Sequence, residues 1–223
     1  MPRAGRVRSV ELRGPAGRLE ALLNEGATTA RFTALVCHPH PLGGGTMHNK
    51  VVYHAMKTFN TAQWGLAWPV LRFNFRGTGL SEGIHDGVAE WEDVASALAW
   101  LETEYKLPII AAGFSFGSAM ILKACCEKMT AEDTVRGVVA LGLPTLANGI
   151  HFRYDYLQNC SLPKLFVSGN NDAFAPEDEW RRVTGAVSEP KTQVLLPGAD
   201  HFFTGHLDAM QSALSGWLTE RFQ

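Results

Sequence analysis

The ten residues from Pro108 to Gly117 constrain the fold of this chain more than any other stretch. Ile109 to Ala112 is an uninterrupted apolar run, which is typical of a short strand covered on both faces. A Gly-x-Ser-x-Gly turn centred on Ser115 follows, and residues 118–129 then carry apolar side chains at helical spacing without proline or glycine. The stretch therefore predicts a strand, a tight turn and a helix, with the serine hydroxyl exposed at the corner. An ordinary glycine-rich turn between a strand and a helix is the alternative interpretation.

Strand and helix patterns alternate from about residue 31 onward. This order predicts an α/β fold with a mostly parallel sheet and helices on both faces. Before residue 31, two strand patterns flank a turn that contains glycine and proline, and they predict an N-terminal antiparallel hairpin. The expected strands are Val7–Leu12, Arg18–Asn24, Arg31–Cys37, Leu66–Phe75, Ile109–Ala112, Val135–Leu141, Lys164–Ser168 and Thr192–Leu196, and the expected helices are Met47–Ala62, Val88–Tyr105, Ser118–Met129, Pro176–Val187 and Phe203–Phe222.

Length and charge narrow the functional classes. The 223 residues suit one domain that spans residues 1–223. A net charge of −2 gives no electrostatic footprint for nucleic acid or an anionic membrane, and the apolar runs are too short to span a bilayer. The basic N-terminus lacks the apolar segment of a secretory signal.

Cysteine usage points to a reducing compartment. Four cysteines are too few and too irregularly placed for a disulfide framework. The adjacent Cys125 and Cys126 are interpreted as small buried apolar side chains. A cytoplasmic protein is therefore expected.

The loops with unusual composition all follow predicted strands. They cover residues 38–45, 76–86, 113–117, 169–175 and 197–202. The carboxyl ends of parallel strands meet at one edge of a sheet, and ligand sites lie at that edge. We therefore expect these loops to form one site although they are far apart in the sequence.

Three of these loops carry the groups that nucleophilic catalysis by serine requires. Ser115 needs a base, and that base needs a third group to hold its tautomer. His201 follows the last predicted strand and Asp172 follows the strand before it, which gives the chain order Ser-Asp-His of α/β-hydrolases. Asp200 is a poorer orienting acid because adjacent side chains diverge. The alternatives are a capping or core histidine at 201 and a turn-forming aspartate at 172.

An oxyanion hole needs two hydrogen-bond donors. The first expected donor is the backbone N–H of Phe116, the residue after the candidate nucleophile. The second should come from loop 38–45, in which Pro39 and Pro41 have no N–H to donate. The backbone N–H of His40 is preferred, and Leu42 and the Gly43–Gly45 run remain alternatives.

The other polar side chains of these loops predict structural roles. Two histidines with one residue between them and no neighbouring carboxylate or thiol are weak evidence for a metal, so neither a metal nor another cofactor is expected. His38 should brace its loop through hydrogen bonds. In the second loop, Arg76 or Asp86 is expected to form an ion pair across the loop base, with a partner that the sequence does not identify.

Four segments of the chain together resemble one group of known proteins. LVCHPHPLGGGTMHNK at 35–50, RFNFRGTGLSEG at 72–83, GFSFG at 113–117 and GADHFFTG at 198–205 are similar to small bacterial-type α/β-hydrolases related to dienelactone hydrolases. The resemblance implies an α/β-hydrolase fold, a Ser-His-Asp triad and esterase-like activity, and it implies no particular substrate. Dienelactone hydrolases use a cysteine nucleophile where this chain has Ser115, so their substrate is not carried over.

These observations favour a serine hydrolase that cleaves a small to medium ester or thioester through an acyl-enzyme on Ser115. Segment Leu143–Leu162 is too short for a large lid domain, which predicts an open site. The alternatives are a peptidase or amidase, and a non-catalytic binding protein that keeps the fold. The expected partner is the small-molecule ester or thioester, and an edge strand of the hairpin could support a homodimer. Aromatic side chains available to line the site are Phe114, Phe116, Phe152, Tyr154, Tyr156, Phe174 and Phe202.

Overall fold

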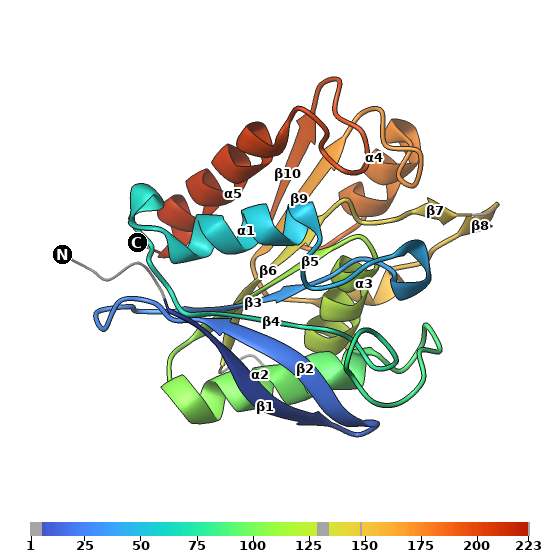
Figure 1. Ribbon diagram of the computed structural model, residues 1–223. Helices are drawn as coiled ribbons and strands as arrows, with labels where there is room; N and C mark the ends of the chain where they lie inside the picture. The colour runs from blue at the N-terminus through green and yellow to red at the C-terminus, as the bar shows by residue number, and fades with distance from the viewer. Residues whose placement is uncertain (1–5, 129–133, 148, 223) are drawn as a thin grey trace.

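The computed structural model describes residues 6–128, 134–147 and 149–222. Within these ranges, eight strands form one sheet in the order β1-β2-β4-β3-β5-β6-β9-β10 (Figure 1). β1 pairs antiparallel with β2, β2 pairs antiparallel with β4, and the remaining neighbours are parallel. The strands are β1 Val7–Gly14, β2 Gly17–Asn24, β3 Thr33–Cys37, β4 Val70–Phe73, β5 Ile109–Phe114, β6 Val135–Leu141, β9 Lys164–Gly169 and β10 Lys191–Leu196.

Five α-helices of the described residues cover the two faces of the sheet (Figure 1). α1 (Lys50–Asn60) and α5 (Leu207–Phe222) pack on one face, and α2 (Trp91–Tyr105), α3 (Phe116–Lys123) and α4 (Glu177–Gly185) supply the core of the other. The strands divide their side chains between the two cores, as the alternation of a pleated strand requires. In β3, Ala34 and Val36 join the α1–α5 side, whereas Leu35 and Cys37 join the α2–α3 side. The predicted mostly parallel sheet with an N-terminal hairpin is therefore confirmed.

Several element boundaries differ from the predicted ones. The second helical pattern starts at Val88 in the sequence, but α2 begins only at Trp91. Before it, Asp86 accepts hydrogen bonds from the backbone N–H groups of Val88 and Ala89, which holds a turn in place of a helix. Similarly, α5 begins at Leu207 rather than near residue 203, and β4 is limited to Val70–Phe73.

Of the two charged residues expected to form an ion pair at the loop base, Arg76 does so, and its partners lie on α2. The Arg76 guanidinium binds Asp93 of α2 with Nη2–Oδ1 at 2.7 Å, and it also contacts Glu92 at 3.0 Å. Asp93 is buried on the first turn of α2, at a position that the apolar periodicity did not include. This buried pair ties loop 76–90 to the helix that follows it.

Segment 144–162, in which the sequence patterns predict no strand or helix, contains short regular elements. β7 (Leu146–Ala147) and β8 (Ile150–His151) form a two-stranded sheet, and a 3₁₀ turn follows at Asp155–Asn159. Residue 148 lies outside the described residues. The part of the chain that the structure describes contains no large lid domain, in agreement with the prediction. In the same ranges, no helix has the length and apolar character that crossing a bilayer requires.

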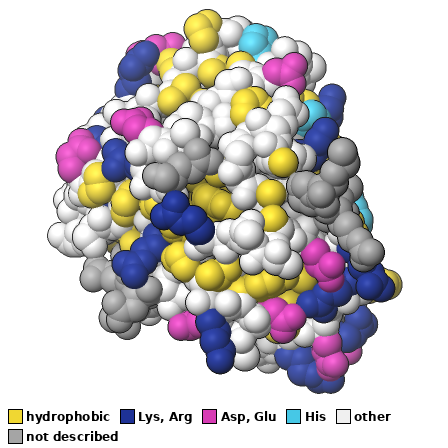
Figure 2. All heavy atoms as spheres, turned by 90° about the vertical axis from the view of Figure 1, so that its left-hand side faces the viewer, with side chains coloured by type: hydrophobic (Ala, Val, Ile, Leu, Met, Phe, Trp, Pro, Cys, Tyr) yellow, Lys and Arg dark blue, Asp and Glu magenta, His cyan; other side chains and the backbone are white. Residues whose placement is uncertain are grey.

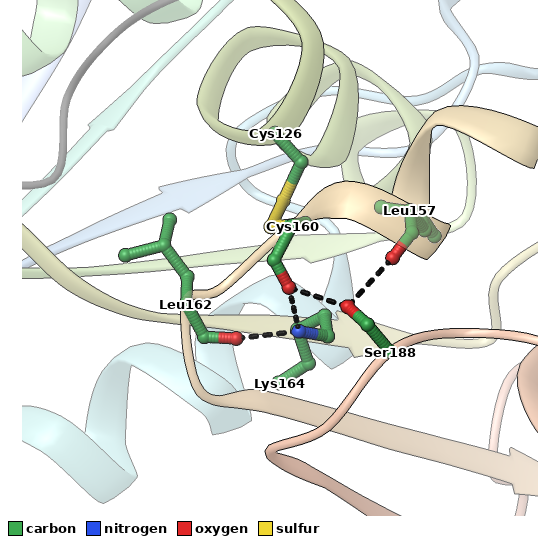
Figure 3. Close-up of a disulfide and its surroundings, with 6 residues drawn as sticks. All are labelled: Cys126, Leu157, Cys160, Leu162, Lys164 and Ser188. Atoms are coloured by element: carbon green, nitrogen blue, oxygen red, sulfur yellow. Dashed lines mark hydrogen bonds between the residues drawn. A yellow bond between two sulfur atoms is a disulfide. The ribbon is translucent and has the colours of Figure 1, made fainter.

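Cys126 forms a disulfide with Cys160, so the interpretation of Cys126 as an unpaired apolar side chain is wrong (Figure 3). The two residues are 34 positions apart in sequence, and their Cα atoms are 5.2 Å apart in the fold. Only the tertiary structure brings them together, because α3 continues as a π-helical turn, Ala124–Lys128, beside the end of the 3₁₀ turn. Cys125 is buried and free, as expected. The cytoplasmic setting rested on the cysteine pattern and stays a prediction.

The surroundings of the disulfide are polar although they are buried (Figure 3). Lys164 is fully buried, and its Nζ donates hydrogen bonds to the carbonyl oxygens of Cys160 at 2.7 Å and Leu162 at 2.6 Å. Burial lowers the pKa of Lys164 to about 8. Ser188 donates a further hydrogen bond to the Cys160 carbonyl. These bonds anchor the segment that leads into β9.

Candidate active site

Ser115 occupies the corner between β5 and α3. Its backbone has φ 54° and ψ −120°, a left-handed conformation that non-glycine residues rarely adopt. The neighbouring glycines make room for this turn. A Cβ atom on Gly117 would lie 2.5 Å from the carbonyl oxygen of His38, and one on Gly113 would overlap the backbone of Gly117. The predicted strand–turn–helix arrangement is therefore present, with loop 38–45 packed directly against it.

Ser115, His201 and Asp172 form one hydrogen-bonded chain. His201 Nε2 lies 3.0 Å from Ser115 Oγ, and His201 Nδ1 lies 2.8 Å from Asp172 Oδ2. The carboxylate acceptor places the imidazole proton on Nδ1, so Nε2 is left to accept the serine proton. The exposed fractions of Ser115, His201 and Asp172 are 9%, 6% and 2%. The three side chains are therefore largely shielded from bulk water, and the serine is the most accessible of them to a ligand.

Each of these three side chains is held in place by its own loop. The backbone N–H of Phe174 donates to Asp172 Oδ1 at 2.8 Å, and the Ser168 hydroxyl lies 3.4 Å from Oδ2. Asp172 follows β9 and His201 follows β10, so the two neighbouring parallel strands deliver base and acid to the same edge. The sheet therefore brings together loops that are far apart in the sequence.

Asp200, the competing acid, has a different role. Its Oδ1 accepts hydrogen bonds from the backbone N–H groups of Phe202 at 3.0 Å and Thr204 at 2.8 Å. The bond from Thr204 is the main reason that the pKa of Asp200 lies below its usual value. Asp200 thus stabilises the turn that presents His201 and leaves the orientation of the imidazole to Asp172.

Most of the candidate oxyanion donors of loop 38–45 form hydrogen bonds within the loop itself. Leu42 N donates to His40 Nδ1 at 3.2 Å, and the N–H groups of Gly43 and Gly45 both donate to the His40 carbonyl at 3.1 Å. Gly44 N donates to the Pro41 carbonyl at 2.9 Å. Within the described ranges, the backbone N–H groups of His40 and Phe116 have no protein acceptor. They are the two donors that remain available to a bound oxygen.

His38 braces the loop, as predicted. Its Nδ1 is 2.7 Å from the Pro39 carbonyl oxygen, and its Nε2 accepts a hydrogen bond from Phe75 N at 3.0 Å. Burial lowers the pKa of His38 to about 4, so the imidazole is neutral near pH 7 and both nitrogens serve the loop. The described residues contain no group of three or more side chains placed to hold a metal ion.

His85 is a neighbour of the site that the sequence patterns left without a role. Its ring lies 4.8 Å from the ring of His40 and 5.3 Å from the ring of Phe116. Its Nδ1 is 2.6 Å from Glu90 Oε1. The one available signal was its position in a glycine-rich loop that follows a strand.

Aromatic rings flank His201 at the surface. The ring of Phe174 lies 4.6 Å from the imidazole and that of Phe202 lies 5.2 Å from it, and both are partly exposed. Phe114 also contacts His201 but is fully buried, and Tyr154 is buried with its hydroxyl bonded to the Pro144 carbonyl. Of the aromatic residues considered from sequence, Phe174 and Phe202 therefore lie where a ligand could touch them.

The fold agrees with comparisons to known proteins. Residues 34–213 match a family model described as an alpha/beta hydrolase domain. The chain belongs to the α/β hydrolase family. A curated Rickettsia prowazekii (strain Madrid E) relative of this α/β hydrolase, itself described as uncharacterized, is 31% identical and aligns over 92% of this chain and 86% of the relative.

Two solved structures resemble this α/β hydrolase over nearly their whole length. An alpha-beta serine hydrolase homologue from Coxiella burnetii has a TM-score of 0.82 and 33% identity, covering 95% of this chain and 97% of that one. A serine hydrolase without a lid from Xanthomonas campestris has a TM-score of 0.81 and 27% identity, covering 96% and 94%. The predicted α/β-hydrolase fold is confirmed, and the descriptions of these neighbours support hydrolase activity.

Proposed function

We propose that this α/β hydrolase cleaves a carboxylic ester or thioester of small to medium size through an acyl-enzyme on Ser115. The observation that carries the proposal is the position of His201, which lies within hydrogen-bond distance of both Ser115 and Asp172. A serine hydroxyl becomes a useful nucleophile only when a positioned base removes its proton. A binding protein that merely kept the fold would have no physical need for all three groups in this order.

In the first half of the reaction, Ser115 Oγ attacks the substrate carbonyl carbon and His201 Nε2 takes the hydroxyl proton. Asp172 stabilises the imidazolium that forms, without itself taking the proton. The resulting oxyanion accepts hydrogen bonds from the backbone N–H groups of Phe116 and His40. The imidazolium then protonates the leaving alcohol or thiol, and an acyl-enzyme remains on Ser115.

In the second half, His201 acts as the base toward a water molecule. The water attacks the acyl carbon, the oxyanion forms again in the same place, and the proton held by His201 returns to Ser115 Oγ as the acid leaves. The start of α3 at Phe116 supports both oxyanions, because the free N–H groups and positive dipole end of a helix favour negative charge.

The substrate size follows from the open edge of the sheet. No large lid domain covers Ser115 in the described part of the chain, and the flanking rings of Phe174 and Phe202 are 42% and 52% exposed. Such a surface accommodates a small or medium acyl group without a conformational opening.

The proposal is tested by covalent labelling and ester turnover. The wild-type protein, Ser115→Ala and the exposed-serine control Ser212→Ala are treated with a fluorophosphonate and assayed on p-nitrophenyl and acyl-CoA esters of graded length. We expect labelling and turnover of the wild type and of Ser212→Ala, and neither reaction of Ser115→Ala. The chain-length optimum then measures the acyl pocket. Unlabelled, folded wild-type protein, or full turnover by Ser115→Ala, would exclude the proposed mechanism.

A further inference from the structure

The side chain of His40 lies at the mouth of the site and is not used by the mechanism above. Its ring contacts the edge of Phe116, with the ring centroids 5.1 Å apart, and Phe116 directly follows Ser115. The backbone N–H of the same histidine is the proposed second oxyanion donor. A substrate whose carbonyl oxygen binds that N–H therefore has its neighbouring atoms close to the His40 imidazole.

The hydrogen bonding of His40 determines which proton it can offer. Nδ1 accepts the hydrogen bond from Leu42 N, so in the neutral ring the proton is on Nε2. Partial desolvation by the loop lowers the pKa of His40, His85 lowers it further and Glu90 acts in the opposite direction, so the net shift favours this neutral form. His40 is exposed, and its Nε2–H is thus a donor directed by the loop and available to a ligand.

The His85 imidazole packs against His40, and the Glu90 carboxylate lies beside His85. The His85 ring is nearly perpendicular to that of His40, at 84°. His85 Nδ1 is close to Glu90 Oε1, which already accepts the N–H groups of Asp86 and Gly87. The side chains of His85 and Glu90 are 7% and 0% exposed, and among the described residues neither His85 Nδ1 nor Glu90 Oε2 has an aligned hydrogen-bond partner. Two buried polar atoms without aligned partners beside a candidate catalytic site are unusual in a purely structural cluster.

We propose that His40, positioned by His85 and Glu90, is a specificity residue that donates a hydrogen bond to a second, uncharged oxygen acceptor near the scissile carbonyl. The favoured substrates are esters or thioesters with an ether, keto or hydroxyl oxygen in the acyl part, in preference to plain alkyl esters. This inference rests on the proposed function and names the substrate class of the same site.

The chemistry of the cluster selects an uncharged acceptor over a carboxylate. The neutral His40 imidazole offers one donor and no net charge. The buried Glu90 carboxylate lies next to His85, which packs against His40. A second carboxylate from the substrate would be repelled by the buried Glu90 carboxylate. Leu42, whose backbone N–H binds His40, and Ile84, which precedes His85 in the chain, carry apolar side chains that are each 84% exposed. An oxygen within an otherwise apolar chain matches these surroundings.

The test uses two esters that differ in a single atom. p-Nitrophenyl methoxyacetate has an ether oxygen where p-nitrophenyl butyrate has a methylene group. The readout is the ratio of their kcat/KM values in the wild type, in His40→Asn and in His48→Asn. Asparagine at 40 can still accept the Leu42 N–H but cannot extend a donor as far as Nε2. His48 is an exposed histidine of the same region and serves as the control.

We expect His40→Asn to lower the methoxyacetate-to-butyrate ratio about 3- to 10-fold, the effect of one lost hydrogen bond. His48→Asn should leave the ratio unchanged. If the substitution disturbs loop 38–45, both esters should lose the same factor in rate, and this loss cancels in the ratio. An unchanged ratio in His40→Asn would overturn the proposal. So would a preference of the wild type for p-nitrophenyl hemisuccinate that disappears in His40→Asn, because the acceptor would then be charged.

A binding measurement separates this inference from the proposed function. NMR titration of Ser115→Ala with ethyl methoxyacetate and ethyl butyrate should show tighter binding of the ether, and the difference should vanish when His40→Asn is added. If the wild type turns over no ester, the proposed function fails, and the titration still decides whether His40 recognises the oxygen. Equal affinities for the two esters would refute the subsite by themselves.

Discussion

The two edges of the sheet differ in what their loops contain. At the carboxyl edge, loops that follow β3, β4, β5, β9 and β10 bring together buried polar side chains, including Ser115, Asp172 and His201. At the amino edge, which lies on the face shown in Figure 2, two open surface pockets of about 350 and 620 Å³ are lined mainly by apolar residues together with Arg31 and Arg136. Phe32 and Phe222 border both pockets. The same strands therefore end in a site with buried polar side chains on one side and in a largely apolar, open surface on the other.

The two edges differ in the chemistry of their side chains, because reactive polar groups gather only at the carboxyl edge among the described residues. Backbone strain does not separate them: Ser115 and Phe203 at the carboxyl edge have φ values of 54°, and Ala67 and Lys106, which precede β4 and β5 at the amino edge, have φ values of 48° and 53°. Such conformations persist only where surrounding contacts hold them. At the amino edge, the rings of Phe32 and Trp68 pack 5.0 Å apart and close the core. Substitutions at the two edges should consequently separate activity from stability.

The largest effect should come from Asp172→Asn. The amide can no longer hold the His201 proton on Nδ1, so Nε2 is not free to accept the serine proton, and we expect kcat to fall about 10⁴-fold. The melting temperature should change little in comparison. Ester kinetics and thermal unfolding of the same preparation measure both quantities.

Asp200→Asn is the matched control for that variant. Asp200 binds backbone N–H groups of its own turn, and an asparagine oxygen can accept the same bonds. We expect less than about a tenfold loss of kcat. Equal losses in the two variants would mean that the acid is not Asp172 alone.

Gly117→Ala should affect activity and stability together. Its methyl group would press against the carbonyl oxygens of His38 and Cys37, which lie 2.5 and 2.6 Å from the ideal Cβ position. Backbone groups cannot rotate away, so the oxyanion loop must shift. We expect the free energy of unfolding to fall by about 2–4 kcal/mol and kcat to fall about 10²-fold.

Gly216→Ala is the control, because a Cβ atom at Gly216 would have open space around it. Gly216 lies in α5, so the substitution should raise stability by about 0.5–1 kcal/mol. Similar outcomes for the two glycines would contradict the close approach at Gly117.

The pH dependence of stability should report on His38. Its pKa is about 4 in the folded protein and near 6.5 when unfolded, so between these values the unfolded chain binds more protons. The contribution to stability is complete above pH 6.5 and is lost as the pH falls toward 4. Compared with His38→Gln, the wild type should lose on the order of 3 kcal/mol more over this range. Denaturant unfolding at several pH values measures the difference, and parallel curves would show that His38 does not titrate as described.

The smallest effect should come from Phe32→Ala at the amino edge. Loss of the half-buried ring and its contacts with Trp68 and Phe222 should lower the free energy of unfolding by about 1–2 kcal/mol. kcat should stay within about twofold of the wild type, because the changed residue is at the opposite edge from Ser115. A large fall in kcat without unfolding would show that the two edges are coupled.

The sequence by itself determined the order of strands and helices, the mostly parallel sheet and the loops that meet at its carboxyl edge. These features follow from apolar periodicity and from turn residues, which act over a few neighbouring positions. The same local signals placed Ser115, Asp172 and His201 at strand ends, and the parallel sheet is sufficient to bring such ends together.

Other features were decided only by the tertiary structure. The partner of Arg76, the disulfide between Cys126 and Cys160, and the approach of His85 to His40 each join segments from different elements. The hydrogen bonds that occupy the N–H groups of Leu42, Gly43 and Gly45 likewise depend on how their loop folds back on His40. Local patterns carry no information about these pairings, because each depends on distances that exist only after the helices and strands have packed.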